Sequence, residues 1–224
     1  MPALLLGSLS TLADTSELQR EAFNEAFETH GLDWRWERDD YVAMLETNGG
    51  QDRVTAYAAA RGEAVDAAAI HQTKSALFQQ HLAAGAISAR PGVVETIAAA
   101  RDGGFKVGLV TTTSPENVAA LTAALAGSVD VAAFDLVVDS SQVEASKPDA
   151  AAYLFALERL GENATDCVAV EDNVGGVASA TSAGIACVAF PHANTAGHGF
   201  EQAAGRVDEL DFAELRDLAN DLDA

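Results

Sequence analysis

Three kinds of polar side chain follow the short apolar runs of this sequence. Hydroxyl groups lie in residues 8–11 and 111–114, each directly after such a run. A lone ammonium, Lys147, and a carboxylate pair, Glu171 and Asp172, come later in the chain. Hydroxyls hold phosphate oxygens, an ammonium neutralises them, and carboxylates supply the hard oxygen ligands that Mg²⁺ prefers. Brought together, these groups would form a site for a phosphate and a divalent cation.

Five apolar runs are candidates for the strands that position these groups. They are Ala3–Leu6, Val107–Val110, Phe134–Val138, Cys167–Val170 and Ala186–Phe190. Helical patterns separate the runs, and this alternation predicts an α/β fold with a parallel five-stranded sheet. In an open parallel sheet, ligands bind beyond the carboxyl ends of the strands. The polar groups that follow the runs are therefore expected to share one edge of the sheet.

The segment between the first two runs is too long for a single crossover connection. Residues 16–85 show helical spacing and no strand pattern. We therefore expect two domains. Residues 1–15 and 86–224 form the α/β core, and residues 16–85 form an inserted all-helical cap over the site.

Several motifs carry a resemblance to a known family. Residues 11–15 are similar to the end of the first motif of the haloacid dehalogenase superfamily. Thr111 matches the second-motif hydroxyl, Lys147 the third-motif lysine, and residues 171–176 the fourth motif. Residues 49–53, Gly-Gly-Gln-Asp-Arg, resemble the cap of the branch that holds β-phosphoglucomutase and the CbbY-type sugar-bisphosphate phosphatases.

The resemblance implies a Rossmann-like core, a helical cap and a mechanism. Family members transfer a phosphoryl group from a small sugar phosphate through an aspartyl-phosphate, with Mg²⁺ as cofactor. The family's functional positions fall on residues of this chain in three groups. These are phosphate binding by Thr111, Thr112 and Lys147, substrate contact from the cap by Arg53 and Gly50, and metal binding by Asp172 and Glu171. The CbbY-like cap implies a pentulose bisphosphate as substrate.

The first motif departs from the family at both of its acidic positions. Gly7 stands where the family has its nucleophile, and Leu9 where it has its general acid and base. Neither residue can attack phosphorus or transfer a proton, and one metal ligand is lost with the first carboxylate. Removing a catalytic nucleophile lowers turnover by about 10⁴- to 10⁶-fold. The sequence therefore predicts a catalytically defective homologue with weakened Mg²⁺ binding.

Two kinds of residue near positions 7 and 9 are alternatives for the missing nucleophile. Asp14 lies close along the chain, but with Glu17 three residues later it resembles a helix cap. Ser8 and Ser10 flank the altered positions, but neither has an evident base beside it in the sequence. Asp14 is thus the first substitute to test.

Structural roles compete with the functional readings. The threonines could satisfy loop backbone groups, Arg53 could be a solvated cap residue, and Lys147 could pair with Glu171 or Asp172. Packing is the simpler role for the aromatic residues Trp34 and Trp36. His192 and His198 lie six residues apart on a Gly-containing loop, a spacing that is not specific for a metal.

Composition excludes several classes of function. The chain has 224 residues, with 34 acidic and 13 basic side chains and a formal net charge of −21. This charge opposes binding to nucleic acid or to anionic lipid. The sequence shows neither a membrane-spanning apolar run nor a signal-peptide pattern. Cys167 and Cys187 lie in apolar runs and are expected to be buried thiols, which favours the cytoplasm.

Three functions remain as hypotheses. The preferred one is a defective phosphatase homologue that keeps a pocket for a small phosphorylated metabolite and acts by binding, with a protein partner as an option. The second is an active Mg²⁺-dependent phosphohydrolase that uses displaced groups such as Asp14. The third is a structural or oligomeric interaction protein. Whether the chain is an enzyme is left open by the sequence.

Overall fold

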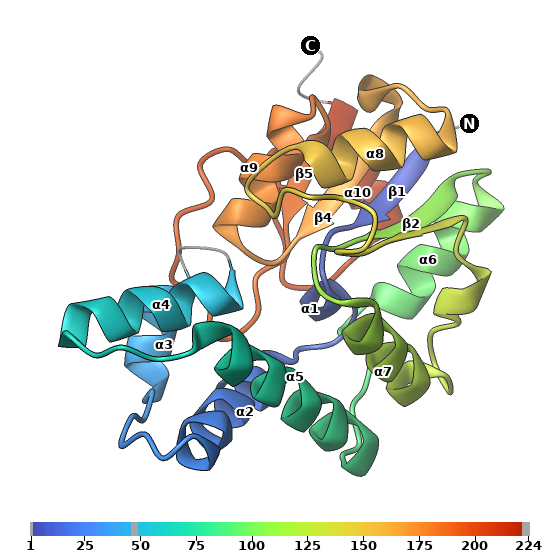
Figure 1. Cartoon of the computed structure of the whole chain (residues 1–224). Coiled ribbons are helices and arrows are strands. Elements are labelled where there is room, and N and C mark those ends of the chain that lie inside the picture. Colours follow the sequence, from blue (N-terminus) through green and yellow to red (C-terminus); the bar gives the residue numbers. More distant parts are fainter. Residues whose placement is uncertain (1, 46–48, 221–224) are drawn as a thin grey trace.

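The computed structural model describes residues 2–45 and 49–220. Its strands form one parallel sheet in the order β3-β2-β1-β4-β5-β6. The strands are β1 (Ala3–Leu6), β2 (Lys106–Val110), β3 (Leu136–Val138), β4 (Cys167–Glu171), β5 (Ala186–Ala189) and β6 (Gly205–Arg206). The α/β class is confirmed, and Figure 1 shows the sheet with helices packed around it.

The prediction of five strands was wrong, because the sheet has a sixth. Strand β6 consists of a glycine and an arginine, so it lacks the apolar run that marks a strand in the sequence. It joins the sheet through backbone pairing with β5, where Val188 lies opposite Gly205. The third strand also begins later than expected, at Leu136, because residues 131–133 form a 3₁₀ turn.

The helices fall into two sets. The core set is α1 (Leu9–Leu12), α6 (Val93–Asp102), α7 (Pro115–Leu125), α8 (Ala151–Leu160), α9 (Val174–Ser182) and α10 (Phe212–Asn220), with 3₁₀ turns at Val131–Ala133 and Ala164–Asp166. The second set lies between β1 and β2 and is called here the helical insertion. It consists of α2 (Ser16–Thr29), α3 (Arg38–Met44), α4 (Gly50–Arg61) and α5 (Ala67–Ala84).

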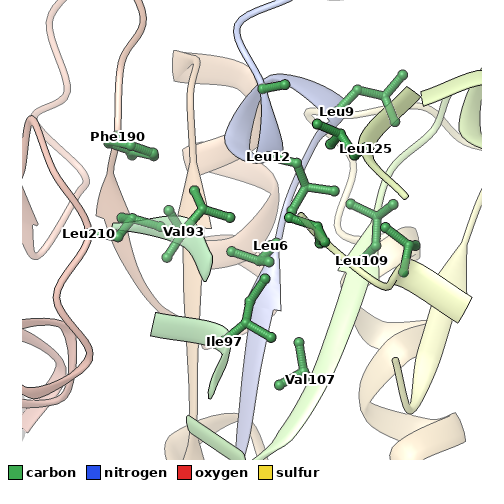
Figure 2. Packing of buried hydrophobic residues seen from close by; sticks show 14 of the residues in the cluster. Leu6, Leu9, Leu12, Val93, Ile97, Val107, Leu109, Leu125, Phe190 and Leu210 are labelled. Atoms are coloured by element: carbon green, nitrogen blue, oxygen red, sulfur yellow. The ribbon is translucent and has the colours of Figure 1, made fainter. Parts of the chain in front are cut away.

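Strand β1 lies at the centre of the core and is buried on both faces. Leu4 and Leu6 belong to a hydrophobic cluster with α6, α7 and α10, while Ala3 and Leu5 belong to a second cluster with α8 and α9. Alternate residues of a strand point to opposite faces, so a run without polar residues suits a strand covered on both sides. Figure 2 shows the first cluster around Leu6.

The helical insertion has a hydrophobic cluster of its own. Phe23, Phe27, Trp34, Trp36 and Tyr41 are buried in it and stack or meet edge to face. The packing role predicted for both tryptophans is confirmed, because Trp34 and Trp36 are almost fully buried among apolar neighbours. Figure 1 shows the insertion gathered on one side of the molecule, next to α7.

Three contacts from two helices of the insertion, α5 and α3, hold it against the core. Gln79 of α5 donates a hydrogen bond of 2.9 Å to Asn117 of α7. Arg38 of α3 donates one of 2.8 Å to Asn194, in the segment after β5. From the same segment, His198 Nε2 lies 3.2 Å from the Val42 carbonyl oxygen. The insertion is thereby fixed over the carboxyl ends of the strands.

The two cysteines are buried free thiols on the neighbouring strands β4 and β5, as predicted. Burial raises the pKa of the Cys167 thiol to about 11 and raises the pKa of the Cys187 thiol well above its ordinary value. Among the described residues, no helix combines the length and the apolar character that a membrane crossing needs.

Candidate functional site

A cavity of about 530 Å³ lies between the carboxyl ends of the strands and the helical insertion. Its core wall comes from the segments after the strands: Ser8, Leu9, Ser10, Thr111, Thr112, Thr113, Ser114, Asn117, Ser140, Ser146, Asp172, Asn173, His192 and Thr195. Its other wall comes from the insertion: Ser16, Gln19, Phe23, Tyr41, Leu45, Gly49, Gly50, Gln51, Asp52, Arg53, His71, Lys74, Ser75 and Phe78.

The structure separates the predicted site residues into two groups. Six of them line the cavity: Leu9, Gly50, Arg53, Thr111, Thr112 and Asp172. The other four predicted positions, which are Gly7, Asp14, Lys147 and Glu171, are not among the described residues that line it. The hydroxyl cluster, one carboxylate and two residues of the helical insertion therefore meet at one cavity, whereas the lysine and the second carboxylate are not part of its lining.

Asp172 is the buried carboxylate of the cavity. Its Oδ1 accepts hydrogen bonds from the Ser8 hydroxyl at 2.6 Å and from the Asn173 amide at 3.0 Å, and His192 Nε2 lies 3.2 Å from Oδ2. Burial alone would raise the pKa of Asp172, but these three partners outweigh it and lower the pKa below its ordinary value. Asp172 is therefore an ionised carboxylate with both oxygens engaged.

The expectation that Ser8 has no base beside it was wrong, because the fold brings Asp172 against it. Ser8 is the N-cap of α1, and its hydroxyl accepts from the Thr11 N–H at 3.2 Å while it donates to Asp172. The lowered pKa of Asp172 makes this carboxylate a weak base. Ser10 instead exchanges a hydrogen bond of 2.9 Å with Thr15.

Lys147 and Glu171 form a buried ion pair beneath the cavity wall. Lys147 Nζ lies 2.5 Å from Glu171 Oε1, and it donates to the carbonyl oxygens of Val110, at 2.7 Å, and of Gly7. The Tyr153 hydroxyl also donates to Glu171 Oε1, at 2.8 Å. Burial raises the pKa of Glu171 and Lys147 opposes this rise. These contacts occupy the three donors of the Lys147 ammonium.

The side chain of Glu171 fills the space beside Gly7. A Cβ atom at position 7 would lie 2.2 Å from Glu171 Cδ and 2.3 Å from the Tyr153 hydroxyl. On the other side, a Cβ at Gly176 would lie 2.2 Å from Glu171 Cδ. Glu171 is thus wedged between two glycines, and its Oε2 is buried without a hydrogen-bond partner among the described residues. A side chain at position 7 would have to displace it.

Leu9 packs in the hydrophobic core, and Asp14 forms hydrogen bonds at the start of a helix. Leu9 is buried in the hydrophobic cluster that also holds Leu12 and Leu125, and Figure 2 shows it near Leu125. Asp14 Oδ1 accepts from the backbone N–H of Ser16 at 3.0 Å and from its hydroxyl at 2.7 Å, at the start of α2. It lies 4.0 Å from His192 Nδ1.

Lys74 lines the cavity and was not among the residues predicted from the sequence. It lies on α5 in the series Ile70, Lys74, Phe78 and Leu82, whose members are all buried. These positions are four residues apart and share one face of the helix. A lysine in an otherwise apolar buried stripe is the signal that would have identified it. Arg53 and His71 line the same wall.

Comparisons with known proteins agree with this architecture. A family model described as haloacid dehalogenase-like hydrolase matches residues 10–184. The chain belongs to this family. The match begins directly after Gly7 and Leu9, so the two altered positions lie outside it.

Several similar proteins come from the CbbY branch. Protein CbbY of Rhodobacter capsulatus is 36% identical over 216 residues, which cover 95% of each protein. CbbY from Rhodobacter sphaeroides in complex with phosphate matches with a TM-score of 0.85 and 35% identity over 96% of both chains. A mutant of that CbbY in complex with xylulose-(1,5)bisphosphate also has a TM-score of 0.85, at 36% identity and the same coverage.

The haloacid dehalogenase-like family generally uses Mg²⁺, and the donor set of this chain does not fit that ion. Mg²⁺ requires close to octahedral coordination by oxygen ligands. Both oxygens of Asp172 are engaged, Glu171 is turned toward Lys147, and positions 7 and 9 offer no side-chain oxygen. Among residues 2–45 and 49–220, no group of three or more His, Cys, Asp or Glu residues could hold a metal.

Proposed function

We propose that this member of the family binds a small phosphorylated metabolite and lacks the phosphoryl-transfer activity of its relatives. The observation that carries the proposal is the position of Glu171. Its side chain fills the space that a nucleophilic side chain at position 7 would need, and it is bound there by Lys147 and Tyr153. The space beside Gly7 is therefore filled by a packed, ion-paired group of side chains.

The residues that line the cavity support the binding of a small phosphorylated metabolite. Thr111 and Thr112 lie on the core wall, and Arg53 lies on the opposite wall, where burial lowers the pKa of its guanidinium below the ordinary value. Hydroxyl and guanidinium groups bind phosphate oxygens by charge-assisted hydrogen bonds. We assign residues 16–85 as a cap and the remainder as the core, with the ligand between them.

A sugar bisphosphate is the first ligand to test. Xylulose-(1,5)bisphosphate is bound in the structure of a CbbY mutant that matches this chain over 96% of its length. A cavity of about 530 Å³ is in the range of small-molecule sites. The expected role is binding or regulation, with a protein partner still to be found.

The first experiment measures ligand-dependent thermal stability and phosphate release together. The probes are inorganic phosphate and xylulose 1,5-bisphosphate, each with and without Mg²⁺. Binding to the folded state raises Tm, by an amount that grows with ligand concentration. We expect a rise in Tm without Mg²⁺ and no phosphate release above the buffer rate. The absence of any rise would contradict the binding role.

A double revertant, Gly7→Asp with Leu9→Asp, is the matched variant for turnover. We expect only this variant to release phosphate, because it alone carries both carboxylates. Robust Mg²⁺-dependent turnover by the native chain would contradict the proposal. In that case Asp14→Asn and Ser8→Ala would locate the nucleophile, since Asp14 lies near His192 and Ser8 contacts Asp172.

A further inference from the structure

Lys74 is an amine buried in the wall of the cavity. Its side chain is 4% exposed, and Nζ donates a hydrogen bond of 2.8 Å to Gln19 Oε1. Nζ also lies 4.9 Å from the ring centroid of Phe23 and 5.0 Å from that of Phe78. The amine is therefore held in one place by a neutral amide and two aromatic rings.

The charged groups around Lys74 do not stabilise its protonated form. Among the described residues, no carboxylate forms an ion pair with Nζ, although Asp52 lines the same cavity. Burial, with a smaller contribution from the Arg53 cation, lowers the pKa of Lys74 to about 7. His71, another titratable group of this wall, has its pKa lowered to about 4 by burial, Lys74 and Arg53, so it is neutral at pH 7.

These surroundings favour a nucleophilic amine. A lysine that is desolvated beside another cation loses its proton near neutral pH, and the free amine attacks carbonyl carbons. Gln19 accepts a hydrogen bond and so orients the amine within the cavity wall. The proposed binding role does not itself require a nucleophilic amine.

We propose that Lys74 forms an imine with the aldehyde or ketone carbonyl of a small phosphorylated ligand held in this cavity. The nitrogen lone pair forms a C–N bond while the carbonyl π bond breaks, and the carbonyl oxygen takes up a proton. The nitrogen gives one proton to solvent to form the carbinolamine, whose hydroxyl takes up a second proton and leaves as water while the nitrogen lone pair forms the C=N bond. The nitrogen then gives its last proton to solvent, so the net products are the imine and one water molecule. No oxidant, reductant or metal is needed for this condensation.

The ligand class follows from the rest of the cavity. Arg53, Thr111 and Thr112 are groups that bind phosphate, and they line the same 530 Å³ space as Lys74. A ligand that carries both a phosphate and a free carbonyl would use the two sets at once. This part of the inference rests on the proposed function, whereas the reactivity of the amine does not.

The test uses pyridoxal 5′-phosphate and pyridoxal as probes on the full chain at neutral pH. Borohydride reduction traps any imine as a stable secondary amine, and peptide mass spectrometry locates it. The chain has three lysines, so Lys106 and Lys147 are internal controls. Lys106 is half-buried and paired with Glu162 at 2.6 Å, and Lys147 is buried and paired with Glu171.

We expect Lys74 to be labelled at least ~10-fold faster than Lys106, because a large fraction of its amine is unprotonated at neutral pH, whereas Lys106 is paired with the Glu162 carboxylate. Lys74→Arg, which keeps the charge and removes the amine, should abolish that label. Labelling of Lys106 alone, or of all lysines at one rate, would overturn the proposal.

The two probes separate this inference from the proposed function. Faster labelling of Lys74 by pyridoxal 5′-phosphate than by pyridoxal, with competition by inorganic phosphate, supports both. Equal labelling by the two probes supports a reactive amine at Lys74 and contradicts phosphate recognition by the cavity. A rise in Tm with phosphate but no trapped adduct at Lys74 supports the proposed binding function and overturns the proposal that Lys74 forms an imine.

Discussion

At position 7, the absence of a side chain changes the role of its neighbours. Glu171 enters the space, Tyr153 donates a hydrogen bond to it, and Lys147 is neutralised by it. A buried charge is tolerated when it is paired and hydrogen-bonded, and here Lys147 supplies the pairing. Position 7 thus offers no side-chain nucleophile, and the three donors of the neighbouring Lys147 ammonium are engaged within the protein.

Gly7→Ala tests this packing. Its Cβ would overlap Glu171 and Tyr153, so we expect the free energy of unfolding to fall by about 1–3 kcal/mol. Urea denaturation measures the loss. Gly127→Ala is the matched control, because nothing lies within 4 Å of a Cβ at Gly127, and it should change stability by less than about 0.5 kcal/mol. Equal effects of the two substitutions would contradict the expected overlap between a side chain at position 7 and the side chains of Glu171 and Tyr153.

Lys74→Met tests the cost of burying an ammonium. The pKa of Lys74 is about 7 in the folded protein against an ordinary 10.5, so between these values the unfolded chain binds more protons. The free energy of unfolding therefore rises with pH through this window, and the contribution is complete only above 10.5. The variant lacks this dependence.

We expect Lys74→Met to have a higher Tm than the native chain at pH about 7, with an advantage that shrinks as the pH approaches 10.5. Thermal unfolding of both proteins across this window measures the difference. The other titratable groups are common to both chains, so their contributions cancel in the difference. A constant difference at all pH values would show that Lys74 is not desolvated.

At the scale of elements, the site depends on how the segment after β5 is tied to the insertion and to the end of β1. Arg90, where the chain returns from the insertion, donates to the carbonyl oxygens of Ser10, Phe190 and Pro191 at 2.9, 2.8 and 2.7 Å. Its guanidinium also lies 3.3 Å from the ring centroid of Phe190. This places His192 next to Asp172.

Arg90→Ala is expected to lower the free energy of unfolding by about 2–4 kcal/mol, because it leaves three carbonyl oxygens without their donor. Arg101→Ala is the control, since Arg101 is exposed and donates to one carbonyl, that of Ala133. Urea denaturation compares the two. A loss at position 90 no larger than at position 101 would show that Arg90 does not tie these segments together.

At the scale of the whole molecule, the net charge of −21 sets how stability responds to salt. Like charges on a compact surface repel one another, and this repulsion is weaker in the expanded unfolded chain. Added salt screens it, with a Debye length of about 10 Å at 0.1 M and about 3 Å at 1 M.

We therefore expect Tm to rise as NaCl increases from about 0.01 M to about 1 M, most steeply at the low end, where the Debye length changes most. Scanning calorimetry over this series measures the shift. A parallel series in sucrose is the control. Sucrose is excluded from protein surfaces but screens no charge, so it separates charge screening from the stabilisation that an excluded solute produces. A flat or falling Tm in NaCl would contradict dominant self-repulsion.

Much of the fold could be predicted from the sequence because local patterns encode it. The five apolar runs became strands, and the parallel sheet follows from their alternation with helices. The two cysteines are buried on neighbouring strands as expected. Strand β6 could not be predicted, since backbone pairing with β5 and not an apolar pattern brings Gly205 and Arg206 into the sheet.

The sequence by itself determined which chemical groups this protein has and which it lacks. Gly7 and Leu9 have no carboxylate in any fold, and four ordered motifs identify the family. Only the tertiary structure decided what the remaining groups do. Glu171 and Asp172 are adjacent in the chain, yet one pairs with Lys147 beneath the wall and the other with Ser8 and His192 in the cavity. These partners come from distant segments, and charge pairing and burial at such contacts are set by packing and not by local sequence.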